Sequence, residues 1–411
     1  MKKRIYDDVF VAVDIGTTKI LVLIARKLEG NQFELLGIGK SPSHGLKKGV
    51  VYDISKTVKS IESAVKEAEL MADCQVESAT IGISGAHISA LNSHGMVPVK
   101  GNDITQRDIQ NVIATARAVQ VPEGQKILHV MPQYFVVDGG ERVIDPHGMY
   151  GVRLEAQVHI ITGSVASVQN LVKCCDMAGL RVNDIVLEQL ASAEAVLSVD
   201  ERELGVGMLD IGGGTSDLAL FQGGSIRHTM VLPVAGNHFT NDIAICLKTT
   251  LNDAEEVKKE YGLAHMGMLE KFGQSIEIGT VDGNNNKIIM QSELVSVIEP
   301  RLAEIFALVK AEIDRRRMHH FLVSGFVVTG GGSLLPGICD VAGDILGVST
   351  RVGRPSNLDK FHDALQDPKY ATGYGLLMFT LKNRNKHGIN FDAPMVTRVF
   401  ARMKTWVLDF F

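Results

Sequence analysis

Two short stretches of the chain carry the residue types that bind phosphate groups. Each is an apolar run that ends in Asp, turns through Gly and Thr, and continues into another apolar run. A tight turn of this kind presents backbone N–H groups to phosphate oxygens, and its carboxylate can reach Mg²⁺ directly or through water. The stretches therefore predict two β-hairpins that bind a nucleotide. They read Val13-Asp14-Ile15-Gly16-Thr17-Thr18-Lys19 and Leu209-Asp210-Ile211-Gly212-Gly213-Gly214-Thr215-Ser216-Asp217.

The repetition carries more weight than either stretch alone. One Asp at a tight turn often only caps that turn, whereas matching turns with matching flanks in both halves of the chain predict two related domains that close on one nucleotide. We expect Asp14 and Asp210 to hold Mg²⁺, through its water shell, against the β- and γ-phosphates. Lys19 either neutralises phosphate charge or is an exposed strand residue, and Asp217 is expected to be a structural partner within its turn. The expected N–H and hydroxyl donors are Gly16, Thr17, Thr18, Gly212, Gly213, Gly214 and Thr215.

Composition narrows the class of protein. The chain has 411 residues, of which 45% are hydrophobic, so we expect more than one domain, each with a real core. The formal net charge of −5 gives no electrostatic argument for nucleic-acid binding. The 5 cysteines form no CxxC pair and predict reduced thiols in a cytoplasmic protein. We expect neither a signal peptide nor a membrane-spanning helix, because no long apolar run is present.

The elements that position the first turn follow from hydrophobic periodicity. Residues 9–24 predict the first hairpin, and a third strand follows. Apolar residues at helical spacing predict a helix over 54–71, with Asp53 or Ser55 as its cap. A strand over 76–83 completes a β-β-β-α-β unit.

Residues 84–162 have a different character, because they contain four prolines within a mixed pattern of strands and one helix. We expect a helix near 108–119 and strands near 126–137 and 155–161. This stretch therefore predicts an inserted α+β module. The chain then returns to the first pattern with a helix, a strand and a helix rich in small residues that starts near Glu188.

The second half repeats the plan after its own hairpin. Asp253 is expected to cap a helix, and residues 298–317 predict a long helix that ends in three arginines. A buried strand over 326–329 runs into a glycine-rich turn, which is a place for the adenine or the phosphates of a nucleotide. That turn consists of Gly330, Gly331, Gly332 and Ser333.

The C-terminal part changes composition again. Residues 382–394 are polar without periodicity and predict a flexible linker. Residues 395–411 predict a helix with one apolar stripe, flanked by Arg398, Arg402 and Lys404. Such a stripe usually packs into the core of a protein. Here it follows a linker and combines aromatic residues with flanking cations, which suits a membrane interface with anionic lipid. The stripe consists of Val396, Val399, Phe400, Met403, Trp406, Val407 and Phe410.

Read in order, these features make the chain similar to the actin, heat-shock chaperone and sugar kinase ATPase superfamily. Within it, the chain resembles the FtsA family of bacterial cell-division proteins over essentially its whole length. The first Asp turn matches the family's first phosphate loop. The other stretches that carry the resemblance are residues 69–74 (ELMADC), 84–88 (SGAHI), 128–133 (LHVMPQ), 200–206 (DERELGV) and 299–301 (EPR).

The resemblance implies an α/β, actin-like two-domain ATPase fold with four subdomains, a family-specific inserted α+β subdomain and a C-terminal amphipathic helix. The first half would span 1–83, completed by 163–204 and about 350–381, and the insert would span 84–162. The second half would span 205–349, with a small subdomain at about 228–300, followed by the linker at 382–394 and the membrane-targeting helix at 395–411.

The resemblance also implies ATP and Mg²⁺ in the cleft, slow ATP turnover at most, and head-to-tail filaments of the chain beneath the cytoplasmic membrane at the division site. The implied partners are the C-terminal tail of the tubulin-like protein FtsZ, anionic membrane lipid and later septal proteins. An actin-like pilus-assembly protein and a small-molecule kinase of the same superfamily stay open as alternatives.

Several site residues come from the resemblance. Glu188 lies where the superfamily carries a residue that orients the attacking water, with Gln189 as the neighbouring alternative. A carboxylate at a helix start can also simply interact with the helix dipole. In the relatives, residues at the positions of Glu255 and Lys258 lie over the ribose and adenine, and the resemblance favours this role over the alternative of a solvated ion pair between side chains three residues apart.

Gly330 and the rest of its turn would line the adenine pocket by the same resemblance. Arg301 and Glu304, at the expected start of the long helix, become candidates for binding the FtsZ tail. An ordinary solvated helix face is the alternative, particularly for Glu304.

Overall fold

The first Asp turn belongs to a five-stranded sheet with the order β11-β6-β1-β2-β3. Strands β1, β2 and β3 are antiparallel neighbours, β6 is parallel to β1, and β11 is parallel to β6. The predicted hairpin and third strand are therefore confirmed. The strands are β1 (Val9–Ile15), β2 (Lys19–Lys27), β3 (Phe33–Pro42), β6 (Ser78–Ile83) and β11 (Arg181–Leu187).

Helices cover both faces of this sheet, which is why β1 and β2 are apolar and buried along almost their whole length. Gly37 and Gly39 of β3 let the backbone of α1 (Ile54–Ala72) approach one face. The helix α10 (Ala371–Arg384) packs on the other face beside α4 (Glu188–Val196). Asp53 caps α1, as predicted, by accepting a hydrogen bond from the backbone of Lys56 at 3.0 Å.

A second five-stranded sheet, ordered β14-β13-β12-β17-β18, repeats the same pattern of antiparallel and parallel neighbours. The sequence analysis assigned residues 350–352 to the first half. The structure contradicts this assignment, because β18 pairs with β17 of the second sheet. The sequence analysis also assigned residues 228–232 to the small subdomain, whereas in the structure they belong to β14 of this sheet. The strands are β12 (Val206–Ile211), β13 (Ser216–Gln222), β14 (Ser225–Leu232), β17 (Phe326–Thr329) and β18 (Thr350–Val352).

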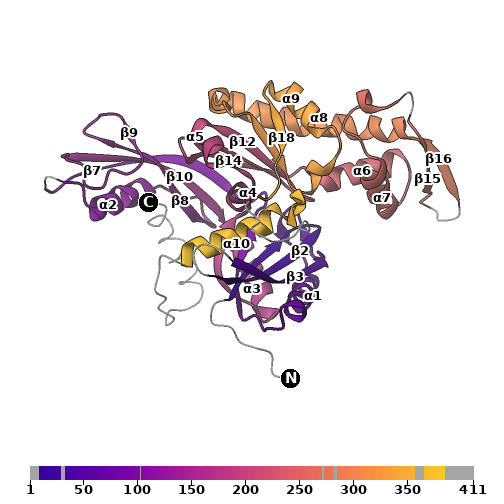
Figure 1. Ribbon diagram of the computed structural model, residues 1–411, viewed down its shortest axis with the longest axis horizontal. Coiled ribbons are helices and arrows are strands. Elements are labelled where there is room, and N and C mark those ends of the chain that lie inside the picture. Colours follow the sequence, from indigo (N-terminus) through magenta and orange to yellow (C-terminus); the bar gives the residue numbers. More distant parts are fainter. Residues whose placement is uncertain are drawn as a thin grey trace.

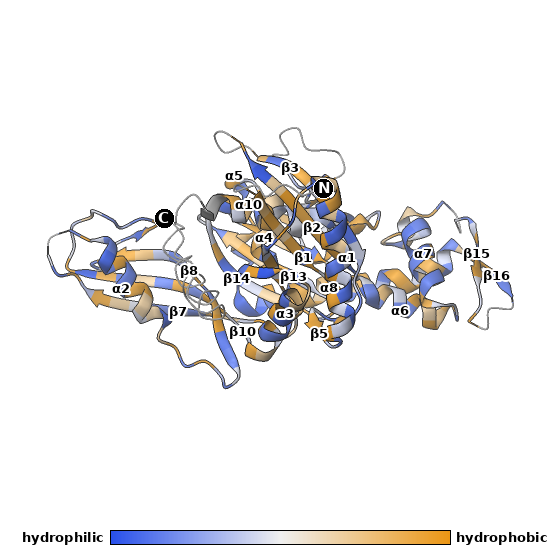
Figure 2. Ribbon diagram, turned by 90° about the horizontal axis from the view of Figure 1, so that it is seen from below, coloured by the Kyte–Doolittle hydropathy of each residue, from blue (hydrophilic) through white to orange (hydrophobic). Residues whose placement is uncertain are grey.

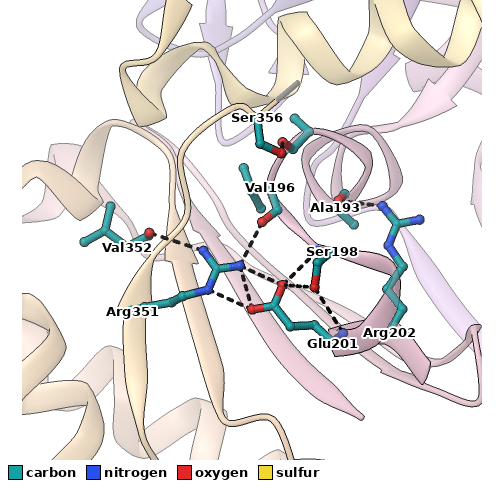
Figure 3. A network of polar contacts seen from close by, with 9 residues as sticks. Ala193, Val196, Ser198, Glu201, Arg202, Arg351, Val352 and Ser356 are labelled. Carbon is teal, nitrogen blue, oxygen red and sulfur yellow. Dashed lines mark hydrogen bonds and ion pairs between the residues drawn. The ribbon is translucent and has the colours of Figure 1, made fainter. Parts of the chain in front are cut away.

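These two sheets occupy the middle of an elongated molecule in the computed structural model (Figure 1), which describes residues 9–28, 33–101, 103–270, 273–281, 285–356 and 365–384. Figure 2 shows that the central strands β1 and β2 are largely hydrophobic. An ion pair connects the second sheet to the helix α5 (Val199–Leu204). Arg351 of β18 pairs with Glu201 of α5 at 2.7 Å (Figure 3).

The stretch predicted as an inserted module forms one end of the molecule (Figure 1). It is a four-stranded antiparallel sheet, ordered β7-β10-β8-β9, with the helix α2 packed on it around a separate apolar core. The helix begins at Gln106, two residues before the predicted start, because Thr105 and Asp108 form a capping box. The elements are β7 (Ser89–Pro98), α2 (Gln106–Arg117), β8 (Gln125–Val137), β9 (Arg142–Val143) and β10 (Arg153–Ser164).

The opposite end of the molecule holds two helices and a two-stranded hairpin (Figure 1). The predicted cap Asp253 is wrong, because Thr250 caps the helix and Asp253 lies in its first turn. The long helix α8 begins at Gln291 and passes through Pro300, since buried apolar side chains continue on both sides of that proline. The elements are α6 (Gly236–Cys246), α7 (Leu251–Tyr261), β15 (Ser275–Gly279), β16 (Asn286–Met290) and α8 (Gln291–Arg316).

The last described helix, α10, extends to Arg384, so residues 382–384 of the predicted linker form its final turn. The rest of the linker and the predicted amphipathic helix at 395–411 lie outside the described residues. Among the helices that the structure describes, none has the length and apolarity needed to cross a bilayer.

Candidate nucleotide site

The two Asp turns have the same backbone geometry. In the first, the Gly16 N–H donates to the carbonyl of Lys19 at 3.0 Å, and in the second the Gly212 N–H donates to the carbonyl of Thr215 at 2.9 Å. Each Asp is the penultimate residue of its strand and faces the start of the returning strand. The sequence repeat therefore corresponds to a repeated structural turn.

The structure brings the two turns into contact with each other. A Cβ atom added to Gly213 would lie 2.2 Å from the methyl carbon of Thr18, and one added to Gly214 would lie 2.4 Å from the hydroxyl oxygen of Thr17. Real Cβ atoms do not approach so closely, so glycine is required where the halves meet. The predicted phosphate donors thus converge from both sheets on one place.

Asp14 is almost completely buried and forms an ion pair with Lys19, whose Nζ lies 2.7 Å from its Oδ2. Burial acts to lower the pKa of Lys19, but the attraction of Asp14, with Asp210 and Glu188 contributing, raises the pKa above its usual value. Lys19 therefore stays charged and turned toward the carboxylates of the site.

Asp210 accepts hydrogen bonds from two hydroxyl groups that the sequence analysis did not single out. Ser192 of α4 donates at 2.5 Å and Thr372 of α10 at 3.1 Å, and the two hydroxyls lie 3.0 Å apart. Burial raises the pKa of Asp210, and the repulsion of Asp14 adds to this effect, while both hydroxyls oppose it. The helix position of Ser192, four residues after Glu188, is the only sequence signal that could have found it.

Glu188 is the first residue of α4 and adds another carboxylate to the same place. Burial raises its pKa well above the usual value, and the charges of Asp14, Asp217 and Asp210 raise it further. Four acidic groups with one lysine leave an excess of negative charge that a cation would offset. Among the residues that the structure describes, no group of three acidic, His or Cys side chains is arranged to bind a metal directly.

Asp217 is buried in a hydrogen-bond network that joins both halves. Its carboxylate accepts from Ser84 at 2.6 Å, from Gln189 at 3.1 Å and from Thr215 at 3.2 Å. Burial raises the pKa of Asp217 to about 7, although the hydroxyls of Ser84 and Thr215 act against this rise. Ser84 lies between β6 and β7, at the start of the inserted module, so the network connects the site with that module.

Glu255 and Lys258 are joined within a polar cluster at the side of the second turn. Lys258 donates to Glu255 at 2.5 Å, to the hydroxyl of Thr240 at 2.9 Å and to the carbonyl of Gly236 at 3.2 Å. Gly236 itself donates to the carbonyl of Gly212 at 3.0 Å. The cluster therefore connects α7 and the start of α6 to the second turn.

The predicted glycine-rich turn lies directly behind Asp210. Gly330 has a φ of +82°, and a Cβ on it would lie 2.1 Å from the Oδ1 of Asp210. The hydroxyl of Ser333 donates back to the carbonyl of Gly330 at 2.7 Å and closes the turn. Gly331 and Gly332 continue the turn in the short helix that follows.

The sequence analysis expected Arg301 and Glu304 at the start of the long helix. In the structure they lie in the interior of α8. Arg301 is held by Asp242 of α6, whose carboxylate accepts from Nε at 2.6 Å and from Nη2 at 3.1 Å, and by Glu304. The seven predicted membrane-facing residues, from Val396 to Phe410, lie outside the described residues.

Comparison with known proteins identifies relatives over nearly the whole chain. A family model described as "Cell division protein FtsA" matches residues 207–375, and one described as "SHS2 domain inserted in FTSA" matches residues 85–162. The FtsA protein of Pseudomonas aeruginosa is 43% identical over 97% of this chain and 97% of its own. That of Escherichia coli K12 is 38% identical over 97% of this chain and 95% of its own.

Solved structures show the same fold at low sequence identity. The PilM-PilN type IV pilus biogenesis complex contains a chain with a TM-score of 0.64 and 18% identity, covering 90% of this chain and 98% of that one. MreB5 of Spiroplasma citri bound to ADP has a TM-score of 0.57 and 16% identity, covering 93% and 99%. The fold is therefore actin-like, with an inserted module, as predicted. Because full-length relatives are 36–43% identical to it, the chain belongs to the FtsA family of cell division proteins.

Proposed function

We propose that this chain binds ATP with Mg²⁺ between its two Asp turns and acts as an assembling adaptor in cell division. The observation that carries the nucleotide part is the meeting of two identical turns, with Asp14, Asp210 and Lys19 around one place. The MreB5 structures, titled as bound to ADP and to AMPPNP, support this reading, since their fold is the same.

The side chains of the site have distinct roles in this proposal. The backbone N–H groups of both turns and Lys19 bind the phosphate oxygens. Asp14 and Asp210 hold Mg²⁺ through its water shell, and the ion supplies charge neutralisation on the phosphates. Glu188, or Gln189 as the neighbouring alternative, would orient a water molecule for attack on the γ-phosphate.

ATP would act as a ligand that holds the two halves of the chain in one relative position. Both turns contribute groups to the same phosphates, so binding favours the closed arrangement. A closed arrangement fixes the geometry of the subunit and thereby favours filaments. The apolar stripe at 396–411 would attach each subunit weakly to anionic lipid, and a filament would multiply that attachment.

Lipid-vesicle sedimentation tests this proposal. The full chain should sediment with anionic vesicles, and more of it with ATP and Mg²⁺ than without. A chain that ends at Pro394 should stay in the supernatant, and Asp14→Ala in the full chain should lose the response to ATP. Equal sedimentation of the full and shortened chains would contradict the membrane role, and an unchanged ATP affinity of Asp14→Ala would contradict the two-turn site.

The FtsZ tail is the second partner in the proposal, with Arg301 and Glu304 as its contact. A peptide with the C-terminal sequence of FtsZ should capture this chain, and Arg301→Glu should weaken capture, whereas Lys310→Glu on the same helix should not. Failure of the wild-type chain to bind would favour the alternative of a pilus-type scaffold. A small-molecule kinase would instead consume ATP only with an acceptor substrate.

A further inference from the structure

A cavity of about 180 Å³ lies where the inserted module meets both halves of the molecule. Its walls include the buried side chains of Met131 in β8, Leu190 in α4, Phe221 in β13 and Phe379 in α10. Ile144, just after β9, also lines it and is 49% exposed. Pockets for small molecules usually measure about 300–1,000 Å³. A cavity of this size and apolar character therefore suits one or two aromatic or aliphatic side chains of a peptide segment.

The polar groups of the cavity carry an excess of negative charge. Arg202 pairs with Glu194 at 3.0 Å, donates to the carbonyl of Ala193 at 2.7 Å (Figure 3) and lies over the ring of Phe221. Glu203 adds a second carboxylate to the lining. Among the side chains that line the cavity, one guanidinium thus accompanies two carboxylates, and Arg227, just outside the lining, is attracted to Glu203. The complementary occupant is an apolar segment that also carries cations.

The chain's own C-terminal segment has this chemistry and starts close by. Phe379, in the cavity wall, lies only five residues before the end of α10 at Arg384. An extended chain spans about 3.3 Å per residue, so the residues between 384 and 396 can reach back across a distance of roughly 35 Å. Residues 396–411 combine an apolar stripe that includes Phe400 and Trp406 with three flanking cations.

We propose that, away from a membrane, residues 396–411 dock into this cavity of the same chain through an aromatic side chain, with their cations beside Glu194 and Glu203. The inference rests on the proposed function for its consequence, since docking and lipid binding would then compete for one apolar stripe. A docked segment hides that stripe from water and keeps single subunits off the membrane. Several tails in a filament would shift the balance toward lipid.

Fluorescence of Trp406, the only tryptophan of the chain, tests the docking without lipid or nucleotide. In the full-length protein its emission should be blue-shifted, and acrylamide should quench it several-fold less than in a peptide of residues 385–411. Ile144→Lys puts a cation at the cavity, which should repel the cations of residues 396–411 and prevent docking. Trp406 of this variant should then show the emission and the quenching seen in the peptide. The matched control Ile288→Lys, at a 75% exposed position of β16, should leave Trp406 protected.

Each outcome decides the proposal. If acrylamide quenches Trp406 in the full chain as strongly as in the peptide, the docking proposal is overturned. It is also overturned if Trp406 is as well protected in Ile144→Lys as in the wild type. Protection that rises with protein concentration assigns the cavity to the tail of a second copy and also overturns it. In vesicle sedimentation, Ile144→Lys should bind several-fold more tightly than wild type. A protected Trp406 in a protein that never binds vesicles would refute the membrane role alone, and vesicle binding with an exposed Trp406 would refute the docking alone.

Discussion

Asp217 shows how one residue makes the site sensitive to pH. Its carboxyl is buried, and burial raises its pKa to about 7, whereas an unfolded chain leaves it near the ordinary value of 3.8. The folded state therefore holds a proton that the unfolded state has lost between these two pH values. The contribution of Asp217 to stability is complete below pH 4 and is lost as pH rises toward 7, by up to about 1.4 kcal/mol per pH unit.

Asp217→Asn should remove this dependence, because an amide does not ionise and its oxygen can still accept from Ser84 and Gln189. We expect the variant to gain about 2 kcal/mol relative to wild type between pH 5 and pH 7. Urea denaturation of the nucleotide-free protein at both pH values measures this difference. A difference between variant and wild type that does not change with pH would show that Asp217 is ionised throughout.

At the scale of elements, the site depends on the close crossing of α10 and α4, which supply Thr372 and Ser192. Gly375 makes this crossing possible, since a Cβ on it would lie 1.8 Å from the carbonyl oxygen of Ala191. The apolar side chains around it are fully buried, so the helices have no free space in which to separate.

Gly375→Ala should therefore destabilise the fold by about 1–3 kcal/mol, as overpacked cores do, and weaken nucleotide binding by displacing Thr372 from Asp210. Gly343→Ala in α9 (Ile338–Leu346) is the matched control, because the nearest atom to its Cβ would be 3.4 Å away. Helix propensity predicts that this control is neutral or slightly stabilising. Thermal unfolding and nucleotide titration of both variants would test the argument, and similar behaviour of the two would refute it.

At the scale of the whole molecule, the inserted module is bound to both halves. The first half holds it through the Leu187 N–H, which donates to His129 of β8 at 3.2 Å, and further polar contacts join it to β14, an edge strand of the second sheet. Gln133 donates to the carbonyls of Ile226 at 2.9 Å and Arg227 at 3.1 Å, and His159 contacts the hydroxyl of Thr229 at 2.9 Å. Burial lowers the pKa of His159 to about 3, so it is neutral in this contact at physiological pH.

Gln133→Leu should loosen this contact at a cost of about 1–3 kcal/mol, because the carbonyl of Ile226 loses the Gln133 donor and that of Arg227 is left with the longer bond from Asn92 at 3.3 Å. Hydrogen exchange should then accelerate in β14 and in the facing strands of the insert, but not in the distant hairpin of β15 and β16. Gln125→Leu is the control, since its hydrogen bond, accepted from Thr162 at 2.8 Å, stays within the insert. Unchanged exchange in β14 would mean that the apolar contacts alone hold the insert in place.

The actin-like class of the fold was predicted from the resemblance to a known family. The pattern of residues by itself determined the two Asp turns, their hairpins and the inserted module. These features are local: a Gly/Thr turn after an apolar run and side chains at strand or helix spacing depend on neighbours along the chain. The ends of elements were predicted less well where local signals competed, as at Pro300, which lies inside α8 although it resembles a helix start.

Only the tertiary structure decided what surrounds the predicted carboxylates. Thr372 reaches Asp210 across 162 positions, and Ser84 reaches Asp217 across 133. The raised pKa of Glu188 comes from burial and from the charges of Asp14, Asp217 and Asp210, which lie on the two Asp turns. Desolvation and side-chain hydrogen bonds depend on which surfaces pack together, and no spacing within one element records that packing. The same reason explains why β14 and β18 were assigned to the wrong parts, since strand pairing is a long-range contact.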